Sequence, residues 1–173
     1  MVFRCFFCLF SAMLFFCSCK VTYSLSGASV PSELRSITIV PYQNVAPLAP
    51  PSLGPTFTES TRNFFAAQTN LKLLPKGGDA LLECRIVGYT VAPVAVQAAP
   101  TGGQNVAAAS RLTVSVNVKY TNTLQEKQNF EQAFSMFADF PSDRSLTTVE
   151  ADLLKDIQQK INTDIFNRCF SNW

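Results

Sequence analysis

A strict alternation of apolar and polar residues along residues 111–121 restricts the fold more than any other feature of the sequence. Successive side chains of a β-strand point to opposite faces, so this segment predicts a strand with one buried face and one solvated face. Its apolar positions are Leu112, Val114, Val116, Val118 and Tyr120. After a polar turn, residues 129–140 place a second apolar set on one face, namely Phe130, Phe134, Met136, Ala138 and Phe140. We therefore expect an antiparallel hairpin that ends at Pro141.

Two earlier strands complete the predicted sheet. Residues 36–42 carry β-branched side chains on both faces, which is typical of an interior strand. A turn is predicted at residues 76–79 by two consecutive glycines. Residues 80–91 after it form a longer predicted strand with three residues on one face, Leu82, Cys84 and Ile86. Residues 71–74 are a weaker candidate for a further strand.

Two segments have helical spacing, and each starts with a Thr followed three residues later by a Glu, the spacing of a capping box. The first predicted helix covers residues 56–68 and buries Phe57, Thr61, Phe64 and Phe65. The second covers residues 147–170, and its apolar stripe consists of Val149, Leu153, Ile157, Ile161, Ile165 and Phe166.

The order β-α-β-β-β-α predicts an α+β fold, a two-layer sandwich with two helices packed on one face of a mixed four-stranded sheet. We expect residues 35–173 to form this single α/β domain. Residues 1–18 are predicted to be a lipoprotein signal peptide. Residues 19–34, which are polar and Ser-rich near their start, are predicted to be a lipidated N-terminus and tether.

The prediction of an export signal rests on the first 19 residues. A short cationic start, ending at Arg4, precedes an apolar run over residues 5–16. A helix of that length spans about 18 Å, too short for the roughly 30 Å hydrocarbon core of a bilayer, although a retained short anchor is the alternative. The cleavage region resembles a lipobox, in which a small residue precedes the acylated Cys. Cys19, after Ser18, is therefore favoured over Cys17, which follows the large Phe16.

Composition excludes several classes of function. The chain holds 14 basic and 12 acidic residues, and loss of residues 1–18 removes only Arg4, so the formal charge falls from +2 to +1. A nucleic-acid-binding protein needs a clustered basic face, so nucleic acid is not an expected partner. Histidine is absent, and no metal cluster or nucleophile motif stands out. We therefore expect no enzymatic activity, no metal site and no cofactor.

Short motifs along the chain carry a resemblance to a known family. They lie at residues 19–27 (CKVTYSLSG), 44–47 (NVAP), 57–59 (FTE), 68–71 (QTNL), 78–79 (GD), 88–89 (GY) and 164–173 (DIFNRCFSNW). In these motifs the chain resembles the lipopolysaccharide-assembly lipoproteins of the LptE-like family, in the form found in Bacteroides-type Gram-negative bacteria. The resemblance covers essentially the whole mature chain, and its motifs are structural in kind.

The resemblance implies a lipid-anchored protein on the periplasmic side of the outer membrane. Such a protein enters the lumen of a large β-barrel partner as a plug and assists insertion of lipopolysaccharide into the outer leaflet. Surface-exposed lipoproteins of such bacteria tend to carry acidic residues just after the acylated Cys. Residues 20–26 contain none, so we expect a periplasm-facing protein. The alternative is a generic periplasmic lipoprotein that binds a soluble ligand or scaffolds another envelope complex.

Three basic residues and one long segment are candidate contacts with the lipid or the partner. Arg85, Arg111 and Lys119 could bind lipid phosphates through charge-assisted hydrogen bonds, or could be ordinary solvated charges. Residues 92–110 are Ala-rich and almost uncharged, and we expect them to form a long loop. That loop could extend into the barrel lumen, or could be a flexible surface excursion.

Tyrosine, tryptophan and cysteine residues leave two questions open. Tyr23, Tyr42, Tyr89 and Trp173 could anchor an interface, although core packing is the preferred interpretation. Cys84 and Cys169 could form a disulfide in the oxidising periplasm. The alternation makes Cys84 face the core, which favours a buried free thiol instead.

Overall fold

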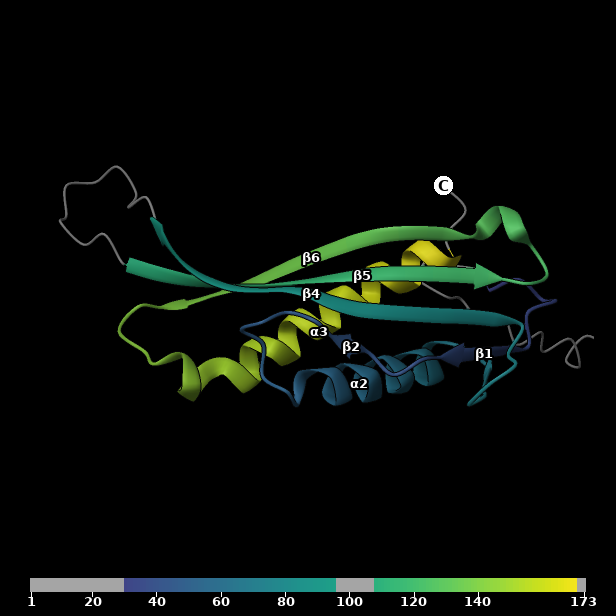
Figure 1. The fold of residues 1–173 in the computed structure, drawn as a ribbon, viewed down its shortest axis with the longest axis horizontal. Helices are drawn as coiled ribbons and strands as arrows, with labels where there is room; N and C mark the ends of the chain where they lie inside the picture. Colours follow the sequence, from purple (N-terminus) through teal and green to yellow (C-terminus); the bar gives the residue numbers. More distant parts are fainter. Residues whose placement is uncertain (1–29, 96–107, 171–173) are drawn as a thin grey trace, which may run out of the picture.

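A twisted sheet with two helices against one face makes up the described part of the chain (Figure 1). The computed structural model describes residues 30–95 and 108–170. Its elements are β1 (Ser36–Ile39), β2 (Gln43–Asn44), α2 (Leu53–Gln68), β3 (Lys72–Leu73), β4 (Ala80–Ala95), β5 (Ala108–Asn122), the short 3-10 helix η1 (Glu126–Gln128), β6 (Phe130–Pro141) and α3 (Leu146–Phe170). The predicted α+β two-layer class is confirmed.

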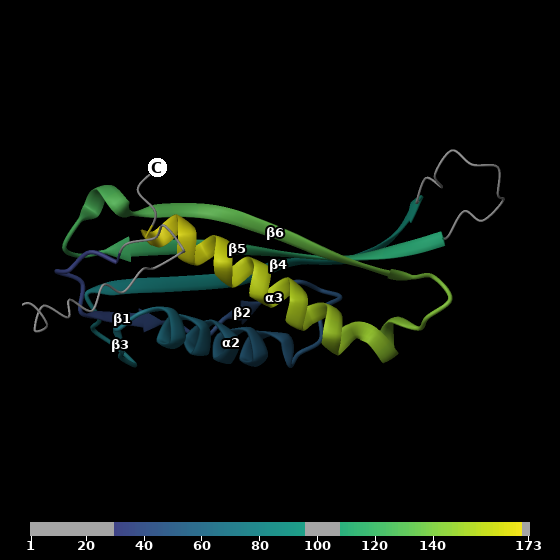
Figure 2. The ribbon, with the colours of Figure 1, turned by 180° about the vertical axis from the view of Figure 1, so that it is seen from behind.

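The sheet joins a parallel part to an antiparallel part. β1 pairs in parallel with both β3 and β4, and β2 pairs in parallel with β4. β4, β5 and β6 pair antiparallel, which gives the spatial order β3-β1-β4-β5-β6. α2 lies below β1 and β2 in Figure 1, and α3 crosses the face of β4, β5 and β6 that Figure 2 turns towards the reader. No described residue covers the opposite face of these three strands with a second layer.

The predicted number of four strands is wrong, because the described residues hold six. The strand predicted over residues 36–42 ends early, at Ile39 of β1, and the separate strand β2 begins just beyond the predicted range, at Gln43. Pro41 between them has no N–H to donate to a ladder. The weaker candidate at residues 71–74 supplies β3, which pairs with β1 at Ser36 and Ile37. The interior position predicted for this part of the chain is confirmed, because all four residues of β1 are buried.

The buried face predicted for each strand of the hairpin is confirmed. The five alternating apolar residues of β5 are at most 1% exposed, and Phe134, Ala138 and Phe140 of β6 are buried. Against them pack Ile157, Ile161, Ile165 and Phe166 of the predicted α3 stripe. An aromatic cluster closes one end of this core, with edge-to-face contacts that link Phe65, Phe166, Phe170 and Tyr120.

The capping-box predictions for the two helices are wrong. α2 starts at Leu53, and Pro55 fits its first turn, where the missing N–H costs no helical bond. The Thr56 hydroxyl donates back to the Ser52 carbonyl at 2.8 Å, so it lies inside the helix and does not cap it. In α3 the expected capping residue Glu150 accepts a hydrogen bond from the Tyr89 hydroxyl of β4 instead.

The predicted turn before β4 requires both of its glycines. Gly77 has a φ of 73°, a conformation that L side chains rarely adopt. A Cβ on Gly78 would lie 2.7 Å from the Thr38 backbone nitrogen, so any side chain there would collide with β1. Asp79 then accepts hydrogen bonds from the Ser36 hydroxyl at 2.8 Å and from the Ser36 N–H at 3.0 Å. These contacts fix the start of β4 beside β1.

β4 contains a β-bulge at Val87. Ile86 pairs with Val116 of β5, whereas Gly88 pairs with the next residue along, Ser115. The extra residue changes which positions face the helices: Ile86 does so before the bulge, and Tyr89 does so after it.

The long loop predicted over residues 92–110 is partly wrong, since β4 continues to Ala95 and β5 begins at Ala108. β4 and β5 stay paired as far as Ala95 and Ala108, so their hairpin projects beyond the N-terminal end of α3 (Figure 1). The remaining residues 96–107 lie outside the described residues, as do the predicted signal peptide and Cys19, Tyr23 and Trp173.

The two helices share a buried chain of polar side chains. The Thr61 hydroxyl donates to Asn162 Oδ1 at 2.8 Å, so its oxygen is left to accept from the Tyr42 hydroxyl at 3.0 Å. Asn162 Nδ2 donates to the Ser60 hydroxyl at 3.1 Å. Tyr42, Thr61 and Asn162 are at most 6% exposed, so these groups satisfy one another away from solvent.

We expect Asn162→Ala to destabilise the fold by about 2–3 kcal/mol, because it leaves the buried Thr61 hydroxyl without its acceptor. Asn63→Ala is the matched control, since Asn63 is an exposed residue of α2. Urea unfolding followed by circular dichroism measures both free energies of unfolding. Equal effects from the two substitutions would show that the polar chain contributes nothing to stability.

Candidate functional site

The face of β4, β5 and β6 that points away from the helices is the candidate functional surface, named here the open face. Its side chains are polar or small along most of the strands. The open face consists of the side chains of Glu83, Arg85, Thr113, Ser115, Asn117, Lys119, Glu131, Ala133, Ser135, Phe137 and Asp139, with Arg111 near one end. Phe137 is the large apolar side chain among them. The same alternation that builds the core creates this face, because each buried residue has exposed neighbours in the chain.

Charges on the open face are matched in sign. The basic residues Arg85, Arg111 and Lys119 face three acidic ones, Glu83, Glu131 and Asp139. Cross-strand pairing explains the match: Lys119 lies opposite both Glu83 and Glu131, and Lys119 Nζ is 3.8 Å from Glu83 Oε2. These six residues carry no net formal charge, so the face is polar without being basic.

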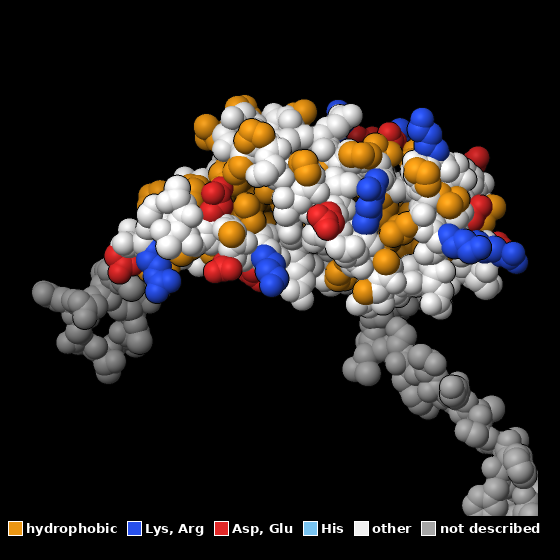
Figure 3. Space-filling model, turned by 90° about the horizontal axis from the view of Figure 1, so that it is seen from below, with side chains coloured by type: hydrophobic (Ala, Val, Ile, Leu, Met, Phe, Trp, Pro, Cys, Tyr) orange, Lys and Arg blue, Asp and Glu red, His pale blue; other side chains and the backbone are white. Residues whose placement is uncertain are grey.

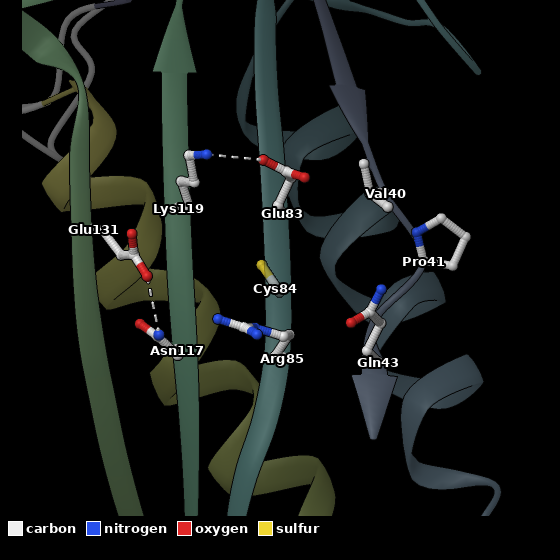
Figure 4. A pocket seen from close by; sticks show the side chains of 9 residues that line it. All are labelled: Val40, Pro41, Gln43, Glu83, Cys84, Arg85, Asn117, Lys119 and Glu131. Atoms are coloured by element: carbon white, nitrogen blue, oxygen red, sulfur yellow. Dashed lines mark hydrogen bonds and ion pairs between the residues drawn. The ribbon is translucent and has the colours of Figure 1, made fainter. Parts of the chain in front are cut away.

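A shallow cavity of about 280 Å³ lies over β4 and β5, between the open face and the segment that joins β1 to β2 (Figure 4). It is lined by Val40, Pro41, Gln43, Glu83, Cys84, Arg85, Asn117, Lys119 and Glu131. Asn117 Nδ2 donates to Glu131 Oε1 at 3.3 Å across it. Within the described residues the Arg85 guanidinium has no ion-pair partner, in contrast to Lys119. Arg85 is exposed, so its five N–H donors are available to an anion.

Two of the three predicted cations come together, and the third does not. Arg85 and Lys119 line the same cavity. Arg111 lies eight residues from Lys119 along β5, a separation of about 27 Å in a strand. Its guanidinium donates two hydrogen bonds to Asp139, at 2.6 and 2.8 Å, and lies 3.7 Å from the centre of the Phe137 ring. These hydrogen bonds hold the pKa of the Asp139 carboxyl below its usual value.

The sequence reasoning missed the acidic residues that neutralise these cations. Glu83 and Glu131 appear in the sequence as isolated charges, and only the strand register places them beside Lys119. The signal that identifies them is the alternation of side chains between the two faces of a strand. Glu83 lies one residue from the core-facing Cys84, so it must point to the open face, where Lys119 also points.

Core packing is confirmed for the two tyrosines that the structure describes. Tyr42 is 6% exposed and Tyr89 is 7% exposed. Burial raises the pKa of both hydroxyls, and the Glu150 hydrogen bond raises that of Tyr89 further. The Tyr89 hydroxyl ties β4 to the first turns of α3, which is a structural role.

Cys84 and Cys169 are free buried thiols in the structure, and Cys84 faces the core as predicted. Burial raises the pKa of the Cys84 thiol to about 12. The reactive thiolate is therefore scarce at neutral pH. Because the folded pKa is raised, this thiol favours the folded state below its unfolded pKa and loses that contribution as the pH rises towards 12.

A second hollow lies beside α2. On the face of the molecule seen from below, hydrophobic side chains lie between charges of both signs (Figure 3). The second hollow measures about 460 Å³ and is lined by Pro41, Tyr42, Pro55, Thr58, Glu59, Arg62 and Asn63. Arg62 Nη2 donates to the Ile39 carbonyl at 2.9 Å, so this cation is engaged by the protein itself.

Two features bear on membranes and metals. Across residues 30–95 and 108–170, no helix is long and apolar enough to cross a bilayer. The same residues contain no group of three or more potential metal ligands.

The sequence matches the family model of LptE, described as lipopolysaccharide-assembly, over residues 34–169. A search of curated proteins by sequence found no match. The match therefore covers the sheet, both helices and the open face, and begins just before β1.

Solved structures with a similar fold come from several bacteria. A Xanthomonas campestris protein has a TM-score of 0.54 at 10% identity, covering 86% of this chain and 89% of that chain. A hypothetical protein from Chlamydia trachomatis has a TM-score of 0.51 at 11% identity, covering 80% and 99%. An uncharacterized lipoprotein B from Nitrosomonas europaea has a TM-score of 0.50 at 16% identity, covering 86% and 88%. At these identities the likeness shows the fold alone.

We expect the two body thiols to react only when the protein unfolds. In protein acylated at Cys19, Ellman's reagent at pH 8 should detect less than one thiol per native chain and about two after addition of guanidinium chloride, because Cys84 and Cys169 are buried. A native chain that gains no thiols on unfolding, but gains them after reduction, would contain a disulfide that the structure lacks.

Proposed function

The chain belongs to the LptE family of lipopolysaccharide-assembly proteins, and from this premise we propose that it acts as a plug in the β-barrel of a lipopolysaccharide translocon. Members of this family are outer-membrane lipoproteins of lipopolysaccharide transport and assembly. In the proposed role the protein sits on the periplasmic side of the outer membrane, enters the barrel lumen and assists insertion of lipopolysaccharide into the outer leaflet.

The observation that carries the proposal is the open face of β4, β5 and β6. Matched charges add only about 1 kcal/mol or less per pair to the stability of an exposed sheet, but they leave the whole face without net charge. Wide outer-membrane barrels have polar interiors, and a surface without net charge can fill such a lumen without strong repulsion from charges of either sign. Hydroxyl pairs such as Ser115 with Ser135, 2.9 Å apart, offer further donors and acceptors there.

Acylation at Cys19 supplies the membrane attachment in this proposal. A diacylglycerol and an N-acyl chain contribute about 0.8 kcal/mol per buried methylene, more than stable anchoring requires. Residues 20–30 span at most about 40 Å when extended. The domain can therefore reach from the inner leaflet surface into a barrel without any further membrane contact of its own.

Lipid contact is assigned to Arg85 and Lys119. Both line the cavity of about 280 Å³, and Arg85 lacks an ion-pair partner among the described residues. Phosphate groups of lipopolysaccharide suit the bidentate geometry of a guanidinium. Arg111 is left out of this assignment, because Asp139 already occupies its donors.

The cavity argues against the alternative of a receptor for a small soluble ligand. Such pockets usually enclose about 300–1,000 Å³ and are mostly apolar, so that they cover most of the ligand. The cavity of about 280 Å³ is lined largely by charged and polar residues and lies open on a sheet surface. A headgroup that remains attached to a larger lipid needs no deeper enclosure.

Loss of the acylated cysteine tests the anchor. We expect Cys19→Ser to remove the fatty acids from the intact mass and to release the protein from the membrane fraction, whereas Cys17→Ser should leave both unchanged. Fatty acids retained in Cys19→Ser protein would place the lipid elsewhere.

Pull-down from detergent-solubilised outer membranes tests the partner. Tagged wild-type protein should retain one large β-barrel protein in about equimolar amount, and depletion should lower surface lipopolysaccharide. Retention of a different complex, with surface lipopolysaccharide unchanged, would favour the scaffolding alternative.

Charge removal in the cavity tests the lipid contact. We expect Arg85→Gln with Lys119→Gln to weaken binding of purified protein to lipopolysaccharide by about tenfold, since charge-assisted hydrogen bonds are lost. Arg144→Gln with Lys155→Gln removes the same charge from exposed positions outside the cavity and is the control. Equal weakening in both variants would indicate attraction by overall charge alone.

A further inference from the structure

The outer edge of β4 changes character at the bulge. Before it, β1 pairs with β4 up to Leu82, and β2 pairs up to Ile86. The Val45 N–H donates to the Ile86 carbonyl at 3.0 Å, and this is the last ladder contact on that side. Between Val87 and Ala95, no described residue pairs with the edge, although β5 pairs with the other side throughout.

Pro93 reveals which backbone groups lie on that edge. It pairs with Ser110 but has no N–H, so it cannot form a two-way hydrogen-bonded pair with β5. Alternate residues of an antiparallel strand direct their backbone groups to the same side. Tyr89, Val91 and Pro93 therefore turn their carbonyls outward, and Tyr89 and Val91 turn their N–H groups outward as well. Such a row of donors and acceptors matches the backbone of another extended chain.

The edge lacks the charges that usually prevent such pairing. Soluble proteins protect exposed strand edges with charged residues, and β6 does so with the exposed Glu131 and Asp139. Residues 87–95 (VGYTVAPVA) contain no charge. Val87 and Val91 are 44% and 45% exposed, so apolar side chains flank the free backbone groups.

We propose that this edge of β4 receives an extended, uncharged segment of the barrel partner as an added strand. The proposal rests on the plug function proposed above and names the contact through which the barrel is held. Main-chain hydrogen bonds to Tyr89 and Val91 supply the affinity, and contact with the side chains of Val87 and Val91 selects an apolar segment.

A second copy of this chain fits the edge less well, because of the tether. Two β4 edges that pair antiparallel are related by a two-fold axis perpendicular to the sheet. The described chain begins at the end of the molecule opposite the projecting hairpin (Figure 1), so the tethers of two paired copies would point in opposite directions. Copies anchored in one membrane could then pair only with their sheets lying flat on it, which is incompatible with an upright plug.

The test compares proline substitutions on the two free edges in full-length, lipidated protein. Val91→Pro removes one outward N–H from the edge of β4 and leaves the ladder with β5 intact. Ala133→Pro does the same on the outer edge of β6. Asn117 of β5 directs its backbone groups towards β4, so its partner Ala133 directs its own N–H away from β5, to the free edge. Val91→Thr keeps the N–H and the β-branched shape. We expect Val91→Pro to retain about fivefold less barrel in the membrane pull-down, and Ala133→Pro and Val91→Thr to retain wild-type amounts.

Equal retention by Val91→Pro and wild type would overturn the added strand while leaving the plug function standing. Failure of the wild type to retain a barrel would instead refute the plug function. Should Val91→Pro fold poorly by circular dichroism, a photo-crosslinking amino acid at Val87 gives the second readout, with Ala133 as its control position. Crosslinks from Val87 to an uncharged segment of the barrel support the proposal. Crosslinks to a second copy, or to this chain's own residues 20–29, overturn it.

Discussion

Burial of one face of a three-stranded antiparallel sheet by α3 is the interaction on which the rest of this structure depends. The five apolar residues of β5 lie at the centre of that contact and are almost completely buried. The four aliphatic residues among them each contribute about 1.5–3 kcal/mol when fully removed from water. Because the period of a strand is two, this contact also fixes every side chain of the other face, so the core and the open face are determined together.

The open face carries its charges in cross-strand pairs, and under the proposed plug function this explains how a surface rich in ions can suit a confined polar space. Exposed ion pairs of this kind add little to stability, about 1 kcal/mol or less each. Their effect is on the electrostatic potential: Lys119 beside Glu83 and Arg111 beside Asp139 cancel at short range. Arg85 and Glu131 remain without ion-pair partners among the described residues and line the same cavity, so under the proposed function Arg85 is the cation free to hold an anionic lipid group.

Local patterns predicted the elements that carry most of the core, but they could not predict what depends on register or on tertiary contacts. Alternation identified β5 and β6 and their buried faces, and helical spacing identified the stripe of α3. The capping boxes failed because Pro55 allows α2 to begin earlier and because Tyr89, distant in sequence, competes for Glu150. The counter-charges Glu83 and Glu131 required strand pairing, which no single segment specifies. Small uncharged residues carry a weak strand signal, so the Ala-rich stretch predicts a loop, although part of it extends the hairpin.

The bulge at Val87 separates β4 into two parts with different contacts. Upstream, each position is constrained by the helices on one side and by β1 or β2 along the edge. Downstream, Tyr89 still packs in the core and donates to Glu150 of α3, but Thr90 and the next three residues are exposed. The length of the hairpin arm beyond Tyr89 is therefore not fixed by the core. Adding or removing two residues on each strand would change the reach of the arm by about 7 Å while leaving every helix contact in phase. Under the proposed plug function, trimming this one hairpin would match the protein to a lumen of different depth, with no redesign of the domain that carries it.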